Sequence, residues 1–439
     1  MAAQARRIVL IDPPGFTLGL NTGLGYLCGA LQGAGRSVRV LDFNNKPGRV
    51  RARLEAVRDA DLVGFSLKSS GVAVASELAV QVRRLNPQAL LVAGGAHISV
   101  VGGDFLAESS VFDACLAGEG ESAMAALAAG APFQDIPGFF WREAGRIRGA
   151  SGASRRVSRL DELPLPDYSA FDSVAEGGMD EYPLVTSRGC PHACSYCSVR
   201  LVMGAAWRAR SPERILDELA LARRRYSGLR AFRVLDDNFT LDLARAKEFC
   251  RGLMGKDWSW SCPNGVRADR LDVELLDLMK ASGCRSIAIG IESLDEGVFG
   301  EVHKGESLEA IIQAVRLAQA AGLEVDGFFI IGLPRATYAK DMQTLKKAQG
   351  LGLRRMMWGM AVPYPGTPMA GWARQNAHIL RDWRGGCHTS FNPPPLFETQ
   401  DYSASERIRA YRRAYLRSVR ISDWPVIFRY AWKSLQNLF

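Results

Sequence analysis

The stretch TSRGCPHACSYC, residues 186–197, carries three cysteines, Cys190, Cys194 and Cys197, in a CxxxCxxC arrangement. Three thiolates this close in sequence form a soft sulfur ligand set, which is typical of an iron–sulfur cluster. Three ligands are one too few to close a four-iron cluster, so one iron is left able to bind and activate a small molecule. Zinc is the alternative, but it needs four ligands, and His192 lies in the same tight loop, where its geometry would be poor.

With Tyr196 directly before its last cysteine, the triad resembles the CxxxCx(aromatic)C pattern of the radical S-adenosylmethionine (SAM) superfamily. The resemblance implies a [4Fe–4S] cluster whose open iron chelates the amino and carboxylate groups of SAM. It also implies that reduction splits a carbon–sulfur bond of SAM and gives a 5′-deoxyadenosyl radical.

The chain has 439 residues, of which 47% are hydrophobic, so we expect two or three domains with sizeable cores. Apolar runs stay below the roughly 18–20 residues of a membrane span. The sequence begins MAAQARRIVLID and enters an expected strand at once, without the pattern of a signal peptide. Nine cysteines without a regular framework favour a reducing compartment, and we expect a cytoplasmic protein.

The net charge of +9 is concentrated at the C-terminal end, where residues 401–439 hold eight Arg and Lys against three acidic residues. Within 404–420, Ile408, Tyr411, Tyr415 and Val419 recur at helical spacing, which predicts an amphipathic basic helix. Such a helix either contacts an acidic protein or membrane surface, or packs on the body with its basic face in water. We favour packing on the body. No pattern typical of nucleic-acid binding occurs.

The first 135 residues alternate strands with helices, which predicts a parallel, doubly wound sheet. The expected strands are Arg7–Asp12, Ser37–Asp42, Leu62–Ser66, Ala89–Ala93 and one ending near Cys115. The expected helices are Leu24–Gly33, Val74–Leu85, one near 103–108, and Glu121–Ala129. Ligands of such sheets bind beyond the carboxyl ends of the strands, where this sequence is rich in small residues.

The DPP opening, TGLGYL, LNPQALLVAGGAH and GEGE look like the cobalamin-binding domain of class B radical SAM enzymes. The resemblance implies cobalamin-binding candidates on four loops: Pro14, Ser66, Lys68, Ser69, Gly94, Gly95, His97, Gly118, Glu119 and Gly120. The loop after the first strand has no DxHxxG motif, so we expect cobalamin without a histidine on its lower face. A domain that had lost cobalamin would show the same absence.

We divide the chain into a Rossmann-like domain (1–135), a linker and strap (136–182), a partial (β/α)6 TIM-like barrel (183–384) and a basic helical region (385–439). The linker is rich in proline, and its segment 163–168 looks like the strap that precedes the cluster loop in the family. In the barrel, strands are expected at 183–187, 231–235, 258–262, 285–291, 324–331 and 354–359. Helices are expected at 212–225, 242–253, 272–281, 307–320 and 338–349.

Barrel chemistry lies at the carboxyl ends of strands, and several candidates stand there. Asp236 and Asp237 could bind the SAM amine or act as acid and base, or could cap the helix expected at 242. Cys262 is a candidate reactive thiol, although most lone cysteines pack. Arg267 could pair with a carboxylate of SAM or substrate, or with Asp269 or Asp272.

The segments MKASGCRSIAIGIESLDEGVFGEVHKG, GFFIIGLP and VPYPGTPM are similar to the class B barrel. This resemblance implies that Tyr196 positions adenine through its backbone and that Glu292, followed by Ser293, holds the ribose. It places Gly332 where adenine approaches the main chain. Cysteines without a motif are interpreted as packing residues: Cys28, Cys115, Cys250, Cys284 and Cys387.

The resemblance implies a cobalamin-dependent methyltransferase that acts on an unactivated carbon of a small-molecule or natural-product intermediate. One SAM would methylate cobalamin, and a second would give the radical that activates the substrate. An electron donor such as flavodoxin or ferredoxin is implied. Two alternatives stay open, a cyclase or rearrangement enzyme with the same domains, and an iron–sulfur sensor that binds its cofactors without turnover.

Overall fold

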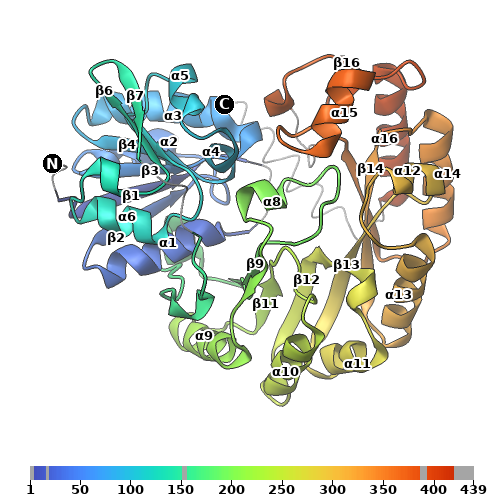
Figure 1. Cartoon of the computed structure of the whole chain (residues 1–439). Coiled ribbons are helices and arrows are strands. Elements are labelled where there is room, and N and C mark those ends of the chain that lie inside the picture. Colours follow the sequence, from blue (N-terminus) through green and yellow to red (C-terminus); the bar gives the residue numbers. More distant parts are fainter. Residues whose placement is uncertain (1–3, 16–18, 151–155, 386–392, 420–439) are drawn as a thin grey trace. The chain divides into compact units, whose positions relative to one another are not determined.

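The computed structural model describes residues 4–15, 19–150, 156–385 and 393–419. These residues form two compact units, one reaching Gly178 and the other starting at Met179 (Figure 1). Within the described ranges, no helix is both long and apolar enough to cross a bilayer. Cys387 and the end of the basic region lie outside the described residues.

The first unit is built on a seven-stranded sheet of order β2-β1-β3-β4-β5-β6-β7. Its first five strands are parallel: β1 (Arg7–Asp12), β2 (Ser37–Asp42), β3 (Leu62–Ser66), β4 (Leu90–Gly94) and β5 (Ala114–Leu116). The helices between them are α1 (Thr22–Gly33), α2 (Val50–Leu54), α3 (Val72–Leu85), α4 (Ala96–Val101), α5 (Asp104–Glu108) and α6 (Glu121–Ala128). The doubly wound parallel arrangement predicted for this region is confirmed.

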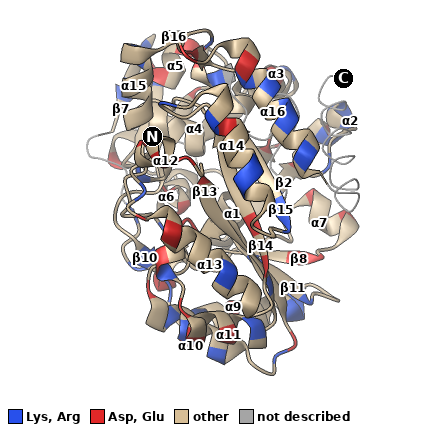
Figure 2. Cartoon of the chain, turned by 90° about the vertical axis from the view of Figure 1, so that its right-hand side faces the viewer, with Lys and Arg blue, Asp and Glu red and all other residues tan. Residues whose placement is uncertain are grey.

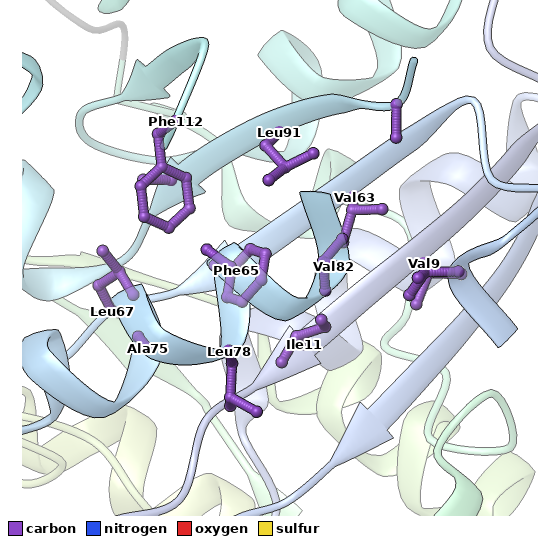
Figure 3. Close-up of a cluster of buried hydrophobic side chains, with 14 of the residues drawn as sticks. Val9, Ile11, Val63, Phe65, Leu67, Ala75, Leu78, Val82, Leu91 and Phe112 are labelled. Atoms are coloured by element: carbon purple, nitrogen blue, oxygen red, sulfur yellow. The ribbon is translucent and has the colours of Figure 1, made fainter. Parts of the chain in front are cut away.

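The central strands β1 and β3 are largely apolar because both faces of the sheet are covered there. Val9, Ile11, Val63 and Phe65 point to one face and pack on the buried side of α3, as Figure 3 shows. Leu10 points to the opposite face, toward Gly64 of β3, whose missing side chain leaves room for it. A continuous core therefore holds the carboxyl ends of β1, β3 and β4 along one edge.

The segment assigned to a linker at 136–182 holds two more strands of the same sheet. Strands β6 (Phe139–Glu143) and β7 (Arg146–Gly149) extend the sheet antiparallel from β5. Helix α7 (Asp172–Gly177) lies against β2, and Asp172 forms a buried ion pair with Arg53, whose Nη2 is 2.7 Å from Asp172 Oδ2. The residues up to Gly178 thus belong to the first unit, because a short hairpin finds its stability on an existing sheet edge.

The second unit is a six-stranded parallel sheet of order β15-β14-β13-β12-β11-β8. The strands are β8 (Glu181–Leu184), β11 (Ala231–Val234), β12 (Ser259–Val266), β13 (Cys284–Glu292), β14 (Glu324–Ile331) and β15 (Arg355–Met360). The helices between them are α9 (Pro212–Arg225), α10 (Leu243–Leu253), α11 (Val273–Ala281), α13 (Leu308–Ala320) and α14 (Tyr338–Gln349) (Figure 1). Because β8 and β15 are the two edges of this sheet, the barrel is partial, as predicted.

Shorter elements complete this unit around the carboxyl ends of the strands. The hairpin-like pair β9 (Ser187–Arg188) and β10 (Arg208–Ala209) encloses the cysteine loop and α8 (Val199–Val202). Helix α12 (Glu296–Gly300) follows β13, and α15 (Pro368–Asn376) leads to β16 (His378–Ile379), which pairs with β17 (Phe397–Glu398). These short elements were not predicted.

The C-terminal helix α16 (Ala404–Ser418) packs on β15 and α14, which confirms packing on the body. Its buried face differs from the apolar stripe expected from the sequence. Arg407, Ala410, Tyr411, Ala414 and Ser418 are buried, whereas Ile408, Tyr415 and Val419 are only partly covered. A basic residue expected in water is therefore inside the protein.

Gly283, directly before β13, offers a test of how the barrel fixes its strands. Its φ is +92°, and an added Cβ would overlap the carbonyl oxygen of Trp258. We expect Gly283→Ala to lower the free energy of unfolding by about 2–3 kcal/mol. Gly322→Ala is the matched control, since Gly322 has φ +77° but meets only the flexible end of Lys280, and it should cost about 1 kcal/mol. Urea unfolding followed by tryptophan fluorescence measures both; equal costs would contradict this account.

Candidate active site

The cysteine loop follows β8, the first strand of the barrel, and is held by backbone contacts on several sides. Gly189 turns the chain with φ +86°, and any side chain there would overlap the carbonyl oxygen of Ala206. Ser195, between two of the cysteines, is buried: its amide donates to the Val302 carbonyl at 2.8 Å, and its hydroxyl donates to the Glu301 carbonyl at 2.7 Å. The Met369 amide donates to the Ser195 carbonyl at 2.9 Å. The loop is thereby tied to α12 and α15.

The three thiols of the loop are partly exposed and near one another. Burial raises the pKa of the Cys197 thiol to about 12, and the charges of Cys194 and Cys190 raise it further. Burial also raises the pKa of Cys194. Iron, when bound, would stabilise the deprotonated thiolates and so offset the raised pKa values. Three cysteine thiolates are soft sulfur donors, the ligand type that iron–sulfur clusters take. The donor set fits a cluster.

His192 is turned to the barrel side of the loop, where Arg267, Asp269 and Glu306 influence it. Burial, with the positive charge of Arg267, lowers the pKa of its imidazole. Its Nε2 atom is buried without a hydrogen-bond partner in the structure. The histidine is therefore neutral at pH 7.

Glu292 ends β13 beneath the loop, and its carboxylate is the centre of a small polar network. It is 4% exposed and has φ +64°, a strained conformation for a residue with a side chain. Its Oε1 atom accepts a hydrogen bond from the Tyr196 hydroxyl at 2.8 Å and lies 3.4 Å from the Lys304 ammonium. Burial and the Glu292 carboxylate raise the pKa of Tyr196 well above its usual value, so the phenol stays a donor. Tyr196 and Glu292, both predicted for SAM, thus meet directly.

Arg267 joins this network from the end of β12. Its guanidinium makes two hydrogen bonds to the Asp269 carboxylate, at 2.9 and 3.0 Å, and one to the Lys304 carbonyl at 2.9 Å. The sequence offered Asp269 and Asp272 as partners of Arg267 within the protein, and the structure pairs Arg267 with Asp269. Asp272 instead caps α11. Glu306 lies between the cations, 3.3 Å from the Lys304 ammonium and 3.8 Å from Arg267.

The paired carboxylates after β11 have separate surroundings. Asp236 is buried and accepts hydrogen bonds from the Thr186 amide, the Thr186 hydroxyl and the Ser187 hydroxyl at 2.5–2.6 Å. Asp237 accepts the Gly189 amide at 3.1 Å, and burial raises its pKa to about 6. Neither caps the next helix, because Asp242 does so itself. Asp236 has a structural role, and Asp237 stays a candidate beside the cluster loop.

The remaining barrel candidates divide between structural and open positions. Cys262 is 2% exposed, and burial raises the pKa of its thiol well above its usual value, so it resembles the packing cysteines. The Ser293 hydroxyl lies 3.2 Å from the Thr344 hydroxyl and accepts the Asp295 amide, which directs it into the protein. Gly332 follows β14 in a left-handed conformation, with φ +79°.

The cobalamin candidates of the first unit all lie at the carboxyl ends of its parallel strands. Gly95 has φ +95°, and a Cβ there would stand 2.8 Å from the Leu67 amide nitrogen, so two loops meet closely. His97 is buried, with its Nδ1 atom 3.2 Å from the Ser69 hydroxyl. The Ser66 hydroxyl accepts a hydrogen bond from Asn21 at 3.0 Å, and Asn21 also donates to Asp12. The structure brings the four loops to one edge of the sheet. The remaining candidates on these loops are Pro14, Lys68, Gly94, Gly118, Glu119 and Gly120.

Sequence reasoning missed Lys304 and Glu306. It also missed the hydrogen bonds by which Ser195 holds the cysteine loop. Lys304 lies near the end of the segment quoted as similar to the class B barrel, after His303 with φ +52°, but no role was assigned to it or to the nearby Glu306. Only the return of this segment to β12 and β13 places their charges at the strand ends. Ser195 is hidden within the cysteine motif, and its partners lie more than one hundred residues away along the chain.

Comparison with known proteins identifies the family of both domains. A model of the radical SAM superfamily matches residues 184–348, and a model of the B12 binding domain matches residues 16–128. An uncharacterized methyltransferase of Pyrococcus horikoshii is 30% identical over 367 residues, which cover 82% of this chain and 78% of the relative. Cytidylyl-2-hydroxyethylphosphonate methyltransferase of Streptomyces wedmorensis is 28% identical over 369 residues (71% and 68%). An anaerobic magnesium-protoporphyrin IX monomethyl ester cyclase of Synechocystis is 27% identical over 365 residues (77% and 70%).

Among solved structures, the radical SAM methyltransferase TsrM from Kitasatospora setae is similar in fold, with a TM-score of 0.69 and 20% identity over 84% of this chain and 76% of that chain. The chain belongs to the radical SAM superfamily, in the group that also carries a B12-binding domain. It is an enzyme, and its cofactors are a [4Fe–4S] cluster, SAM and cobalamin.

The predicted ligand set can be separated from the packing cysteines by substitution. We expect Cys190→Ala, Cys194→Ala or Cys197→Ala to abolish the iron-dependent absorption after oxygen-free reconstitution, because each thiolate binds a separate iron. Cys250→Ala, in the buried face of α10, is the control and should retain full iron and sulfide. Retention of the cluster in Cys194→Ala, or zinc in wild-type protein purified without oxygen, would exclude the assignment.

Proposed function

We propose that this enzyme methylates an unactivated carbon of a small-molecule or natural-product intermediate. The observation that carries the proposal is the thiol triad, short of a fourth ligand, beside a buried carboxylate in a chain that also holds a B12-binding domain. When bound, the cluster and SAM supply a 5′-deoxyadenosyl radical that removes a hydrogen atom from substrate, and cobalamin supplies the methyl group.

The residues of the barrel would bind and orient SAM. The Glu292 carboxylate is held by Tyr196 and Lys304. Its oxygens can accept further hydrogen bonds, and the two hydroxyls of the ribose would donate them. Arg267, the candidate partner for a carboxylate of SAM or substrate, is already paired with Asp269, and Lys304 is paired with Glu292 and Glu306. The main chain at Tyr196 and the turn that begins at Gly332 would receive the adenine.

The loops of the first unit would hold cobalamin. Glycines at Gly94, Gly95, Gly118 and Gly120 let a large macrocycle approach the backbone. The loop after β1 supplies no histidine, so we infer that the lower face of cobalt lacks a histidine ligand. Ser66, Lys68 and Ser69 follow β3 and offer polar groups for the amide side chains of the corrin.

The enzyme requires an electron donor, and the basic helix α16 is a candidate surface for it. Arg409, Arg412 and Arg413 are exposed on this helix, and Leu416 is 73% exposed. Figure 2 shows the basic segments of α16 in blue. Positive charge around an apolar side chain suits an acidic redox protein such as a flavodoxin or ferredoxin. A negatively charged membrane surface would also fit this chemistry.

Formation of a ring without methyl transfer is the second candidate function. It is favoured by the similarity to magnesium-protoporphyrin IX monomethyl ester cyclase, which spans 77% of this chain. Both functions use the same cofactors, so the products alone separate them.

The decisive experiment is product analysis with the full chain, reconstituted without oxygen with iron, sulfide and hydroxocobalamin. With reductant and SAM carrying a deuterated methyl group, we expect both S-adenosylhomocysteine and 5′-deoxyadenosine. Labelled methyl should also appear on cobalamin. Formation of 5′-deoxyadenosine without S-adenosylhomocysteine would contradict methylation and favour the cyclase. The Cys194→Ala variant serves as a control and should form no 5′-deoxyadenosine.

The role of Glu292 in SAM binding is testable by charge removal. Glu292→Gln keeps the shape and still accepts from Tyr196, but replaces charged by neutral hydrogen bonds to the ribose. We expect the KM for SAM in 5′-deoxyadenosine formation to rise about tenfold, corresponding to roughly 1.4 kcal/mol. The matched control is Glu296→Gln, exposed on α12, which should leave KM unchanged. An unchanged KM in Glu292→Gln would remove this residue from the SAM site.

A further inference from the structure

Arg407 of α16 is a cation in the interior of the second unit. It is only 1% exposed, and its guanidinium lies between two aromatic rings, 4.4 Å from the centre of Phe397 and 4.7 Å from that of Tyr402. A buried guanidinium is costly unless its donors are satisfied. Its position therefore calls for a specific acceptor.

That acceptor is the main chain of Gly332. The Arg407 Nη1 group donates to the Gly332 carbonyl at 2.8 Å, and Nε donates to the Tyr402 carbonyl at 3.2 Å. From the other side, Asp341 of α14 accepts the Gly332 amide at 3.1 Å and the Tyr402 hydroxyl at 2.8 Å. Side chains of two helices thus hold both hydrogen-bonding groups of one glycine.

Gly332 can only be glycine in this arrangement. Its φ of +79° disfavours a side chain, and an added Cβ would overlap Arg407 Nη1. The guanidinium can approach the turn closely only because residue 332 is glycine, and the backbone conformation of the turn also favours glycine. The turn Gly332-Leu333-Pro334 directly follows β14, at the carboxyl edge where the proposed SAM site lies.

The pKa values of Asp341 and Arg407 reflect the burial of both side chains around Gly332. Burial raises the pKa of Asp341 to about 7 and lowers the pKa of Arg407 to about 10. The arginine remains charged at neutral pH, so its hydrogen bond to the Gly332 carbonyl is charge-assisted.

Of the three residues that hold this turn, Asp341 lies within the region that the superfamily model matches, residues 184–348, whereas Tyr402 and Arg407 lie outside it. Tyr402 and Arg407 belong to the segment that follows β17. The C-terminal segment therefore does not only pack on the barrel. Its Arg407 also donates a hydrogen bond to Gly332, at the carboxyl edge of the sheet.

We propose that Arg407 is a positioning residue for SAM: through Gly332 it fixes the turn that receives the adenine. The inference rests on the proposed function of Gly332 in SAM binding. It assigns the C-terminal segment a part in cofactor affinity, while the thiol triad holds the cluster without it.

The test uses the full chain with reconstituted cluster, and it titrates SAM against the EPR spectrum of the reduced cluster. We expect Arg407→Gln to raise the half-saturating SAM concentration about tenfold. Iron content and the final spectrum at saturating SAM should match wild type, because the methionine end of SAM meets an intact cluster. Arg407→Lys, which keeps the charge, should lie between the two.

Arg417→Gln is the matched control, an exposed arginine of the same helix, and it should titrate like wild type. Tyr402→Phe is a milder second variant if Arg407→Gln fails to fold, since it removes one donor to Asp341 and keeps the ring over Arg407. It should raise the half-saturating concentration about threefold. Wild-type titration by Arg407→Gln with intact cluster would overturn the inference.

Amide hydrogen exchange gives a readout that does not depend on SAM. In the absence of SAM, peptides spanning 330–337 should exchange faster in Arg407→Gln than in wild type or Arg417→Gln, with peptides of β11 unchanged. Equal exchange would overturn the positioning role. A SAM-independent spectrum in wild type, together with faster exchange in Arg407→Gln, would mean that the proposed SAM site is wrong and the turn is still set by Arg407.

Discussion

Parallel pairing of the strands β8 to β15 is the constraint on which the active site depends. Six neighbouring strands run in one direction, so their carboxyl ends meet at one edge, whatever the distance between them along the chain. The cysteine loop, Asp237, Arg267, Glu292 and Gly332 each follow a different strand of this sheet. A sheet with its strands in mixed directions would divide these groups between two edges.

Buried charge distinguishes this edge from the rest of the molecule. Lys304, Arg267, Glu292 and Glu306 have nearly buried side chains that touch one another, and Glu292 also has a strained backbone. Such networks are expensive to form, and they cluster where a ligand will use their charge. The first unit also has a buried ion pair, Arg53–Asp172, which joins α2 to α7, and Asp172 accepts the amide of Asp42 at the end of β2.

Local patterns predicted the regular elements well. Strands such as Arg7–Asp12 and Glu324–Ile331 and the helix Pro212–Arg225 lie where the sequence places them, since long apolar runs and capping residues are local signals. The hairpin β6–β7 was missed because its strands are short and half exposed, and they gain stability only from pairing with β5. The inward turn of Arg407 was missed for a related reason: charge and spacing predict a solvated face, and its partners lie on β14 and in the segment before α16.

By itself, the sequence predicted the ligand chemistry: three cysteines at fixed spacing are the expected cluster ligands, and glycine-rich strand ends are the expected places where large cofactors approach. It also determined the order of strands and helices, because these follow from short-range periodicity. Only the tertiary structure decided which charges meet. The contacts of Lys304 with Glu292, of Ser195 with Glu301 and of Arg407 with Gly332 join residues that are 12, 106 and 75 positions apart. Such pairings depend on the parallel sheet and its packed helices, and no local pattern encodes them.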